Sequence, residues 1–305
     1  MISIVVPCYN EEEAIPYFYP ETKKYLDQLD TDYEIIFVND GSKDRTVEAC
    51  LKLKEQDPNI VIVSFARNFG KEAAMLAGFR QAKGDYVVVM DVDLQDPPSL
   101  LPKLYDLVTK EGYDSAATYR VTRAGEPKIR SFFARAFYKI INKMIEVEIV
   151  DGARDYRIMS RTMVDAVLSL TEYYRFSKGI FPWVGFKTKY IEYENVERVA
   201  GETKWSFWKL FKYAIDGIVG FTTAPLRIAT VLGILVSMFG FGWMLYIVIK
   251  ALTIGDPVAG YPSLIAIICL LGGIQLLVIG IMGEYLGRTY METKHRPSYV
   301  IREIL

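Results

Sequence analysis

The chain has 305 residues, of which 51% are hydrophobic, and its formal net charge is -1. This near-neutral balance provides no basic field, so no nucleic-acid partner is expected. The three cysteines have no metal-binding spacing and the one histidine is His295, so neither a zinc site nor a Ser-His-Asp hydrolase is expected.

The first 120 residues alternate strand and helix signals. Apolar, β-branched runs predict strands at 2–7, 34–38, 60–65 and 86–90, and helices are expected at 11–29, 45–56 and 71–82. The first strand carries no basic region, so no signal peptide is expected. Strands that alternate with helices at this spacing predict a mostly parallel, doubly wound α/β sheet.

The most informative stretch follows the fourth predicted strand, where Asp91-Val92-Asp93-Leu94-Gln95-Asp96-Pro97-Pro98 ends the strand and turns the chain. Asp91, Asp93 and Gln95 offer oxygen ligands at the carboxyl end of a strand, where open α/β sheets bind their ligands. Hard oxygen donors in small number suit Mg²⁺ or Mn²⁺ shared with the phosphates of a substrate. A polar loop with a solvated acidic tip is the alternative for this motif taken alone.

Three more polar loops follow predicted strands. They are Pro7-Cys8-Tyr9-Asn10-Glu11-Glu12, Asn39-Asp40-Gly41-Ser42 and Arg67-Asn68-Phe69-Gly70-Lys71. The carboxyl ends of parallel strands share one edge of the sheet, and glycines allow close backbone approach to a phosphate. The four loops together therefore predict a nucleotide site, although turn chemistry explains each loop taken alone.

Two long uncharged stretches dominate the second half of the chain, one from Ile228 to Ile249 and one from Pro257 to Gly283. Each exceeds the roughly 20 residues that cross about 30 Å of hydrocarbon, which predicts a transmembrane hairpin. Buried core helices are the alternative. Lysines and arginines gather outside both stretches, so both ends of the chain are expected in the cytoplasm.

Two further segments, 130–149 and 205–220, combine large apolar side chains with lysines and arginines. Such helices can lie in the headgroup plane of a membrane. Core helices with solvated lysines are the alternative. Their position next to the hairpin favours the interfacial interpretation.

The polar loops resemble those of the family 2 inverting glycosyltransferases of the GT-A type. The stretches that carry this resemblance are Val6–Glu12, Val38–Ser42 and Asp91–Pro98. Later stretches resemble the subgroup that glycosylates polyprenyl phosphates; they are Arg154–Arg161, Gly179–Phe186 and Arg198–Trp205. That subgroup includes dolichyl-phosphate mannose synthases and bactoprenol glucosyltransferases with two carboxyl-terminal spans.

The resemblance implies a GT-A catalytic domain (Rossmann-like, with a mostly parallel sheet) followed by interfacial helices and two transmembrane helices. The expected parts are a nucleotide-sugar-binding core at 1–125, an acceptor-side and interfacial part at 126–225, spans at 226–250 and 262–286, and a cytoplasmic tail at 287–305. The implied reaction moves one sugar, glucose in the first instance, from a UDP-sugar to polyprenyl (undecaprenyl) phosphate with inversion. A multi-pass protein of the cell membrane with a cytoplasmic catalytic domain is expected.

The resemblance also implies roles for individual residues. Donor binding is expected from Pro7, Tyr9, Glu11, Asp40, Lys71 and Asp91, and Mg²⁺ or Mn²⁺ binding from Asp91, Asp93 and Gln95. The catalytic residues are expected to be Asp155 and Asp93. Apart from the resemblance, cations beside the amphipathic segments are expected to meet the acceptor phosphate; they are Arg123, Arg130, Arg198 and Lys204. A solvated basic surface drawn to anionic lipid is the alternative for these four residues.

Some of these roles have open alternatives. Asp40 is placed to accept from a uracil N3–H, or is a turn-forming aspartate. Lys71 touches the donor, or is a solvated first-turn lysine. Asp155 accepts a proton, orients the nucleophile or joins the metal, or forms a structural ion pair with the flanking Arg154 and Arg157.

Two other functions remain open on the sequence alone. One is a polyprenyl- or dolichyl-phosphate mannose synthase that uses GDP-mannose. The other is a non-catalytic membrane scaffold that kept a nucleotide-binding fold, which the joint presence of Asp40, Asp91, Asp93 and Asp155 disfavours. The sequence leaves the sugar, the prenyl length and the oligomeric state open, and a homo-oligomer is compatible with it.

Overall fold

The computed structural model describes residues 1–120, 141–145, 147–193, 217–254 and 260–305. The chain divides into two compact units, Met1–Gly217 together with Arg296–Leu305, and Ile218–His295. Most of the two predicted interfacial segments, 130–149 and 205–220, lies outside the described residues.

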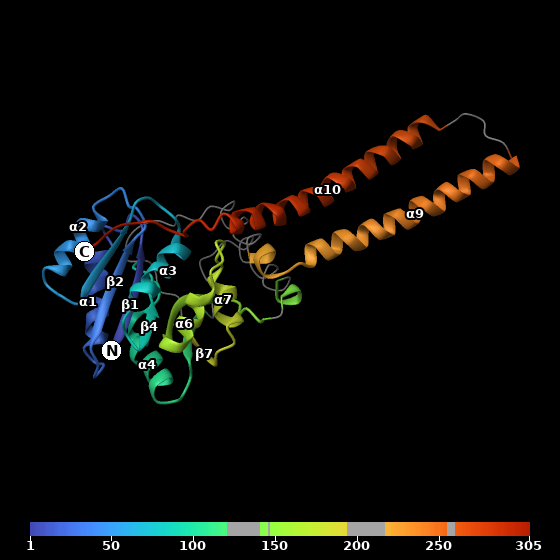
Figure 1. Cartoon of the computed structure of the whole chain (residues 1–305). Coiled ribbons are helices and arrows are strands. Elements are labelled where there is room, and N and C mark those ends of the chain that lie inside the picture. Colours follow the sequence, from blue (N-terminus) through green and yellow to red (C-terminus); the bar gives the residue numbers. More distant parts are fainter. Residues whose placement is uncertain (121–140, 146, 194–216, 255–259) are drawn as a thin grey trace. The chain divides into compact units, whose positions relative to one another are not determined.

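The first unit is built on one eight-stranded sheet with the order β7-β5-β6-β4-β1-β2-β3-β8 (Figure 1). Its strands are β1 (Ile2–Cys8), β2 (Tyr33–Asn39), β3 (Ile60–Phe65), β4 (Tyr86–Val89), β5 (Ser115–Arg120), β6 (Ala153–Ser160), β7 (Thr188–Tyr193) and β8 (Ile301–Ile304). Its helices are α1 (Ile15–Leu26), α2 (Thr46–Lys54), α3 (Lys71–Gln81), the short 3₁₀ helix η1 (Pro98–Leu100), α4 (Leu101–Thr109), α6 (Arg161–Ser169) and α7 (Ser177–Trp183).

Strand direction divides the sheet into two parts. The strands β1 to β4 pair in parallel, as the sequence predicts, and so do β5 and β7. The strand β6 runs antiparallel to both β4 and β5, and β8 runs antiparallel to β3. The predicted α/β fold with a mostly parallel sheet is confirmed.

The central strands are apolar on both faces because helices cover both faces of the sheet. Every residue of β1 from Ile2 to Val6 is buried. Side chains of α1, α2 and α4 pack with Ile4 and Val6, whereas α3 packs on the face that carries Val5. Continuous apolar strands of this kind are typical of parallel sheets.

The approach of α3 to the sheet depends on one glycine. A Cβ atom at Gly78 would lie 2.1 Å from Cγ1 of Val5, so a larger residue would push the helix away from β1. This contact sets the height of α3 over the sheet. It therefore also sets the position of Lys71, the first residue of the helix.

The first helix is shorter than the sequence predicts, because it begins at Ile15 rather than at Glu11. The backbone amide of Glu11 instead donates to the hydroxyl of Thr46 at 2.8 Å, which ties this segment to the neighbouring loop. Asp44 lies just before α2, and its carboxylate accepts from the amide of Thr46, the first residue of that helix, at 3.1 Å.

The strand β8 is not among the strands predicted from the sequence. It lies in the segment 287–305, for which the sequence analysis expects a tail. It pairs with β3 and covers the edge of that strand. The ring of Tyr299 stacks on Phe65 with centroids 5.0 Å apart, and its hydroxyl accepts from Arg80 at 3.1 Å. The residues from Arg296 onward are thus part of the first unit.

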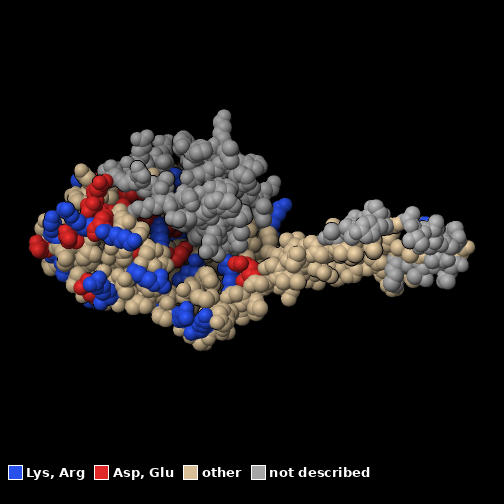
Figure 2. All heavy atoms as spheres, turned by 90° about the horizontal axis from the view of Figure 1, so that it is seen from above, with Lys and Arg blue, Asp and Glu red and all other residues tan. Residues whose placement is uncertain are grey.

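The second unit consists of a short helical turn and the long helices α9 (Ala224–Ile254) and α10 (Tyr261–Thr293), which contain the two predicted spans. Large apolar side chains on both helices are exposed, with Phe239 and Leu276 each 72% exposed. On the face shown in Figure 2, the described side chains of the hairpin are almost all uncharged. Exposed apolar helices of this length are candidate membrane spans.

Candidate active site

The carboxyl ends of the parallel strands lie in register at one edge of the sheet. Cys8 pairs with Asn39, and Asn39 pairs with Ser64. The loops that follow β1 and β2 are joined directly, because the amide of Asn10 donates to the hydroxyl of Ser42 at 2.9 Å. The predicted donor-binding residues in or beside the loops of this edge are Pro7, Tyr9, Glu11, Asp40, Lys71 and Asp91.

Asp40 holds the loop that precedes α3. Its carboxylate is 4% exposed and accepts from the amides of Phe69 at 2.6 Å and Gly70 at 2.9 Å. Burial raises the pKa of Asp40, and these two amides partly offset that effect. Gly41 has a φ of +65°, and a Cβ atom there would lie 2.4 Å from the carbonyl carbon of Arg67. Asp40 thus fixes the start of α3, and its contact with a uracil stays a prediction.

Asp91 and Asp155 face each other because β4 and β6 are antiparallel. Tyr86 pairs with Ser160 and Val89 pairs with Arg157. The same register continued by two residues places Asp91 opposite Asp155. Like charges directly opposite each other on neighbouring strands are destabilising, so this arrangement requires a cation.

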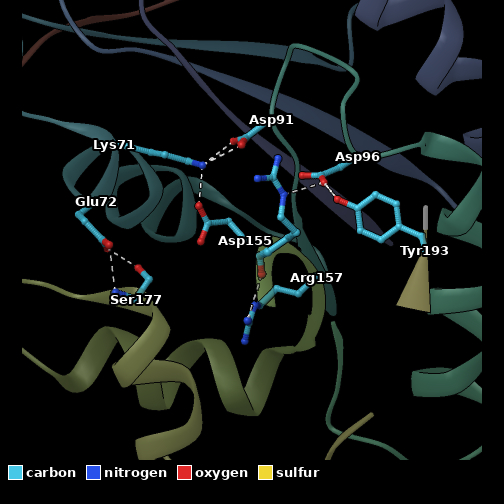
Figure 3. A network of polar contacts seen from close by, with 9 residues as sticks. Lys71, Glu72, Asp91, Asp96, Asp155, Arg157, Ser177 and Tyr193 are labelled. Atoms are coloured by element: carbon cyan, nitrogen blue, oxygen red, sulfur yellow. Dashed lines mark hydrogen bonds and ion pairs between the residues drawn. The ribbon is translucent and has the colours of Figure 1, made fainter. Parts of the chain in front are cut away.

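Lys71 provides that cation (Figure 3). Its Nζ atom lies 2.6 Å from Oδ1 of Asp91 and 2.6 Å from Oδ2 of Asp155. Burial lowers the pKa of Lys71, but the two carboxylates outweigh burial and raise it above its usual range. Burial likewise raises the pKa of Asp155, and the charges of Lys71 and Lys178 outweigh it and hold that pKa well below its usual range. Lys71 and Asp155 are therefore both charged at neutral pH.

The ion pair of Asp155 is thus with Lys71 and not with the arginines that flank it in sequence. Arg154 lies on the opposite face of β6, because side chains alternate along a strand. Its Nε atom donates to Oδ1 of Asp96 at 3.0 Å, and the hydroxyl of Tyr193 donates to the same carboxylate. This buried cluster holds the Asp91–Pro98 loop against β6 and β7.

The loop Asp91–Pro98, called the Asp-x-Asp loop after Asp91 and Asp93, has a strained backbone at its centre. Leu94 has a φ of +56°, a left-handed conformation that costs free energy for a residue with a side chain. The amide of Gln95 donates to Oδ1 of Asp93 at 3.1 Å, so the turn closes on the second carboxylate of the motif. Strained backbone of this kind concentrates at functional sites.

The carboxylates of this edge fit a divalent cation that shares its ligands with a substrate. Within the described residues, no group of three or more His, Cys, Asp or Glu side chains could hold a metal ion. Mg²⁺, however, usually takes one or two carboxylates together with waters and substrate phosphates. The convergence of Asp91 and Asp155 on one ammonium group shows a position built for positive charge.

Sequence reasoning missed several residues of this neighbourhood, which are Glu72, Asp96, Ser177, Lys178 and Tyr193. The sequence Asp96-Pro97-Pro98 is typical of a turn after a strand. That pattern gives no indication that Asp96 forms a buried ion pair with Arg154. No signal in the sequence relates Glu72 to Ser177, because more than a hundred positions separate them. The predicted acceptor residues Arg123, Arg130, Arg198 and Lys204 all lie outside the described residues.

A mostly parallel α/β sheet, an Asp-x-Asp loop at its carboxyl edge and a pair of long apolar helices define a GT-A glycosyltransferase with a candidate membrane hairpin. The chain belongs to glycosyl transferase family 2, whose family profile matches residues 3–168. Residues 224–289 match a second family, described as the GtrB C-terminal hairpin.

Similar proteins match almost the whole chain. The bactoprenol glucosyl transferase of Shigella phage SfV is 44% identical over 301 residues, which are 99% of this chain and 98% of that protein. The putative glycosyltransferase CsbB of Bacillus subtilis (strain 168) is 45% identical over 303 residues, 99% of this chain and 92% of that protein. Among solved structures, mannosyl-3-phosphoglycerate synthase from Rubrobacter xylanophilus shares the fold, with a TM-score of 0.52, 16% identity and coverage of 71% of each chain.

The Asp155–Lys71 pair predicts a specific dependence of stability on pH. A carboxylate whose folded pKa is lowered stabilises the protein above its unfolded pKa of about 3.9, and this contribution is lost as the pH falls toward the folded value. Wild type should therefore unfold at a higher temperature than Asp155→Asn between pH 7 and 5, and the difference should shrink below about pH 4. Thermal unfolding of the purified proteins in detergent measures this.

Asp165→Asn is the matched control, because Asp165 is an exposed aspartate of α6. Its unfolding temperature should follow that of wild type closely at every pH. A difference between wild type and Asp155→Asn that stays constant from pH 7 to 3 would contradict the pairing.

Proposed function

We propose that the protein transfers glucose from UDP-glucose to a polyprenyl phosphate, undecaprenyl phosphate in the first instance, with inversion at the anomeric carbon. An oxygen of the lipid phosphate forms the new bond to the anomeric carbon. The bond from that carbon to the β-phosphate oxygen breaks, and UDP leaves with the electron pair. Similarity to the bactoprenol glucosyl transferases over 99% of the chain, hairpin included, supports both substrates.

The observation that carries the choice of acceptor is the ion pair between Asp155 and Lys71. A sugar hydroxyl would need a base to remove its proton, and a carboxylate with a strongly lowered pKa is a poor base. A phosphate is already ionised at neutral pH and needs only alignment. The state of Asp155 therefore favours a phosphate acceptor, and we assign to Asp155 the alignment of the reacting groups.

The oxygen ligands of the Asp-x-Asp loop suit the diphosphate of the departing UDP. Asp91, Asp93 and Gln95 would hold Mg²⁺ or Mn²⁺, and Asp155 shares Lys71 with Asp91. When bound, this ion would neutralise the charge that develops on the departing diphosphate. Lys71 lies between Asp91 and Asp155, so we assign its ammonium group to the same diphosphate. Asp40 keeps Lys71 in place through the loop before α3.

The membrane orientation follows from the same proposal. With α9 and α10 as spans, the excess of lysine and arginine outside them favours the cytoplasm for both ends of the hairpin. UDP-sugars are then on the same side as the catalytic unit. The protein would be a multi-pass enzyme of the cell membrane.

The donor is tested with purified wild type and radiolabelled UDP-glucose, UDP-galactose, UDP-N-acetylglucosamine and GDP-mannose in turn, with counting of the lipid phase. We expect UDP-glucose to give the highest rate. Asp93→Asn should lower kcat/KM by about 100-fold, because a metal site with few protein ligands loses a charged one. Asp106→Asn, an exposed change on α4, is the matched control and should retain wild-type activity.

The outcomes of this assay separate the alternatives. Preference for GDP-mannose would replace the proposed donor by that of a mannose synthase. The absence of transfer from every donor would favour a scaffold. Near-normal turnover by Asp93→Asn at limiting metal would remove Asp93 from the metal site.

The topology is tested by cysteine labelling in a background that lacks Cys8, Cys50 and Cys269. In sealed cells, a membrane-impermeant maleimide should label Thr253→Cys, near the end of α9, because the hairpin connection faces the exterior. It should label Ser298→Cys only after the cells are opened. Labelling of Ser298→Cys in sealed cells would show the opposite orientation.

A further inference from the structure

The loop Arg67–Lys71, the donor loop, has a second support besides Asp40. It follows β3, and β3 pairs with β8 from the segment Arg296–Leu305. Backbone contact continues beyond the end of β3, because the amide of Ala66 donates to the carbonyl of Val300 at 3.0 Å. The chain segment that follows the two candidate spans therefore reaches the residue directly before the donor loop.

The side chain of Tyr299 contacts the elements that precede and follow the donor loop. Its ring stacks on Phe65, the last residue of β3, with the centroids 5.0 Å apart and an angle of 11° between the planes. Its hydroxyl accepts from Arg80 of α3 at 3.1 Å, and the guanidinium carbon of Arg80 lies 5.4 Å from the centre of the ring. One aromatic side chain thus joins the strand before the loop to the helix after it.

Phe65 extends this support to the donor loop itself. It is 2% exposed, and its ring meets Phe69 edge-on with the centroids 5.8 Å apart. Phe69 is the residue whose amide donates to Asp40 at 2.6 Å. The guanidinium carbon of Arg67 lies 4.0 Å from the centre of the Phe69 ring, so the loop also packs on this ring. Two ring contacts therefore connect Tyr299 to the hydrogen bonds of Asp40.

The position of Lys71 depends on such contacts. Lys71 is the first residue of α3, and Gly70 before it has a φ of +98°. Glycine adopts this conformation at no steric cost, but it also leaves the backbone free to adopt others. Gly70 has no side chain that could cap the helix. The start of α3 is therefore held by what its neighbours contact, and Tyr299 holds two of those neighbours, β3 and α3.

We propose that Tyr299 is a positioning residue for the nucleotide donor, because it holds the donor loop and α3 in the arrangement that places Lys71. The inference rests on the proposed function, which assigns Lys71 to the diphosphate of the donor. Tyr299 acts through the loop and does not touch the donor in this account. The segment after the two candidate spans would then complete the donor side of the site.

The test compares Tyr299→Ala and Tyr299→Phe with the control Tyr17→Ala, which removes the same side chain from an exposed position of α1. All measurements use the full chain, purified in detergent, with Mn²⁺ present. Tyr299→Ala should raise the Kd for UDP and the KM for UDP-glucose by about three- to tenfold, as expected for the loss of an aromatic pair and a hydrogen bond. Tyr299→Phe keeps the stacked ring and should recover most of the affinity, and Tyr17→Ala should behave as wild type.

The KM for lipid phosphate separates donor positioning from general damage to the site. In Tyr299→Ala it should stay within about twofold of wild type. An unchanged Kd for UDP in Tyr299→Ala would overturn the inference while the proposed function stands. An equal rise in the KM for lipid phosphate would also overturn it. A wild type that binds UDP but transfers nothing to lipid phosphate would contradict the proposed function, and the Kd for UDP would still decide the role of Tyr299.

Hydrogen exchange tests the loop directly. The amides of Phe69 and Gly70, which donate to Asp40, should exchange faster in Tyr299→Ala than in wild type, because the loop opens more often. The amides of α4, which packs on the other face of the sheet from α3, should exchange as in wild type. Equally faster exchange in both places would show that Tyr299 only stabilises the fold, and would overturn the inference.

The route through the aromatic rings is tested with Phe69→Leu, which removes the ring contact with Phe65 and keeps an apolar side chain. Phe69→Leu should raise the Kd for UDP in the same direction as Tyr299→Ala. In the double variant Tyr299→Ala/Phe69→Leu, the rise should be smaller than the product of the two single rises, because both changes weaken one support. A rise equal to the product would show that Tyr299 does not act through this ring.

Discussion

The site depends on one electrostatic constraint, which is that a carboxylate just beyond the end of β4 lies opposite a carboxylate on the antiparallel strand β6. The register of β4 and β6 places Asp91 against Asp155, and without a cation between them this edge of the sheet would be unstable. Lys71 supplies that cation from a third element. The close contact of Gly78 with β1 and the hydrogen bonds of Asp40 serve this arrangement, since both determine where α3 begins.

The same constraint limits the chemistry. Asp155 is ionised and paired with Lys71, so it is a poor base for taking a proton from an acceptor. An acceptor that is already anionic suits such a site, and a hairpin of two candidate membrane spans suits an acceptor that is a lipid. The strand β8 returns the chain from the hairpin to the sheet at β3, so the hairpin is joined to the catalytic unit at both of its ends.

The sequence predicts the parts of this structure that depend on local pattern. The parallel strands, the Asp-x-Asp loop and the apolar helices each have a periodicity or a length that identifies them, and β3 has the predicted bounds. Partners across the sheet have no such signal. The pairing of Lys71 with Asp155 depends on β6 being antiparallel, and Arg154 next to Asp155 in sequence suggested the wrong partner. The strand β8 is short and mostly exposed, so its apolar pattern is too weak to predict a strand.

The central claim is that Asp91 and Asp155 form a cation position that Lys71 occupies. Electron paramagnetic resonance of Mn²⁺ tests it directly, with purified wild type and Lys71→Met, each with and without UDP. Without UDP, Lys71→Met should bind Mn²⁺ at least about tenfold more tightly than wild type, because no ammonium competes for the two carboxylates. Equal or weaker binding by Lys71→Met would show that these carboxylates do not form a cation position, and the account would be wrong.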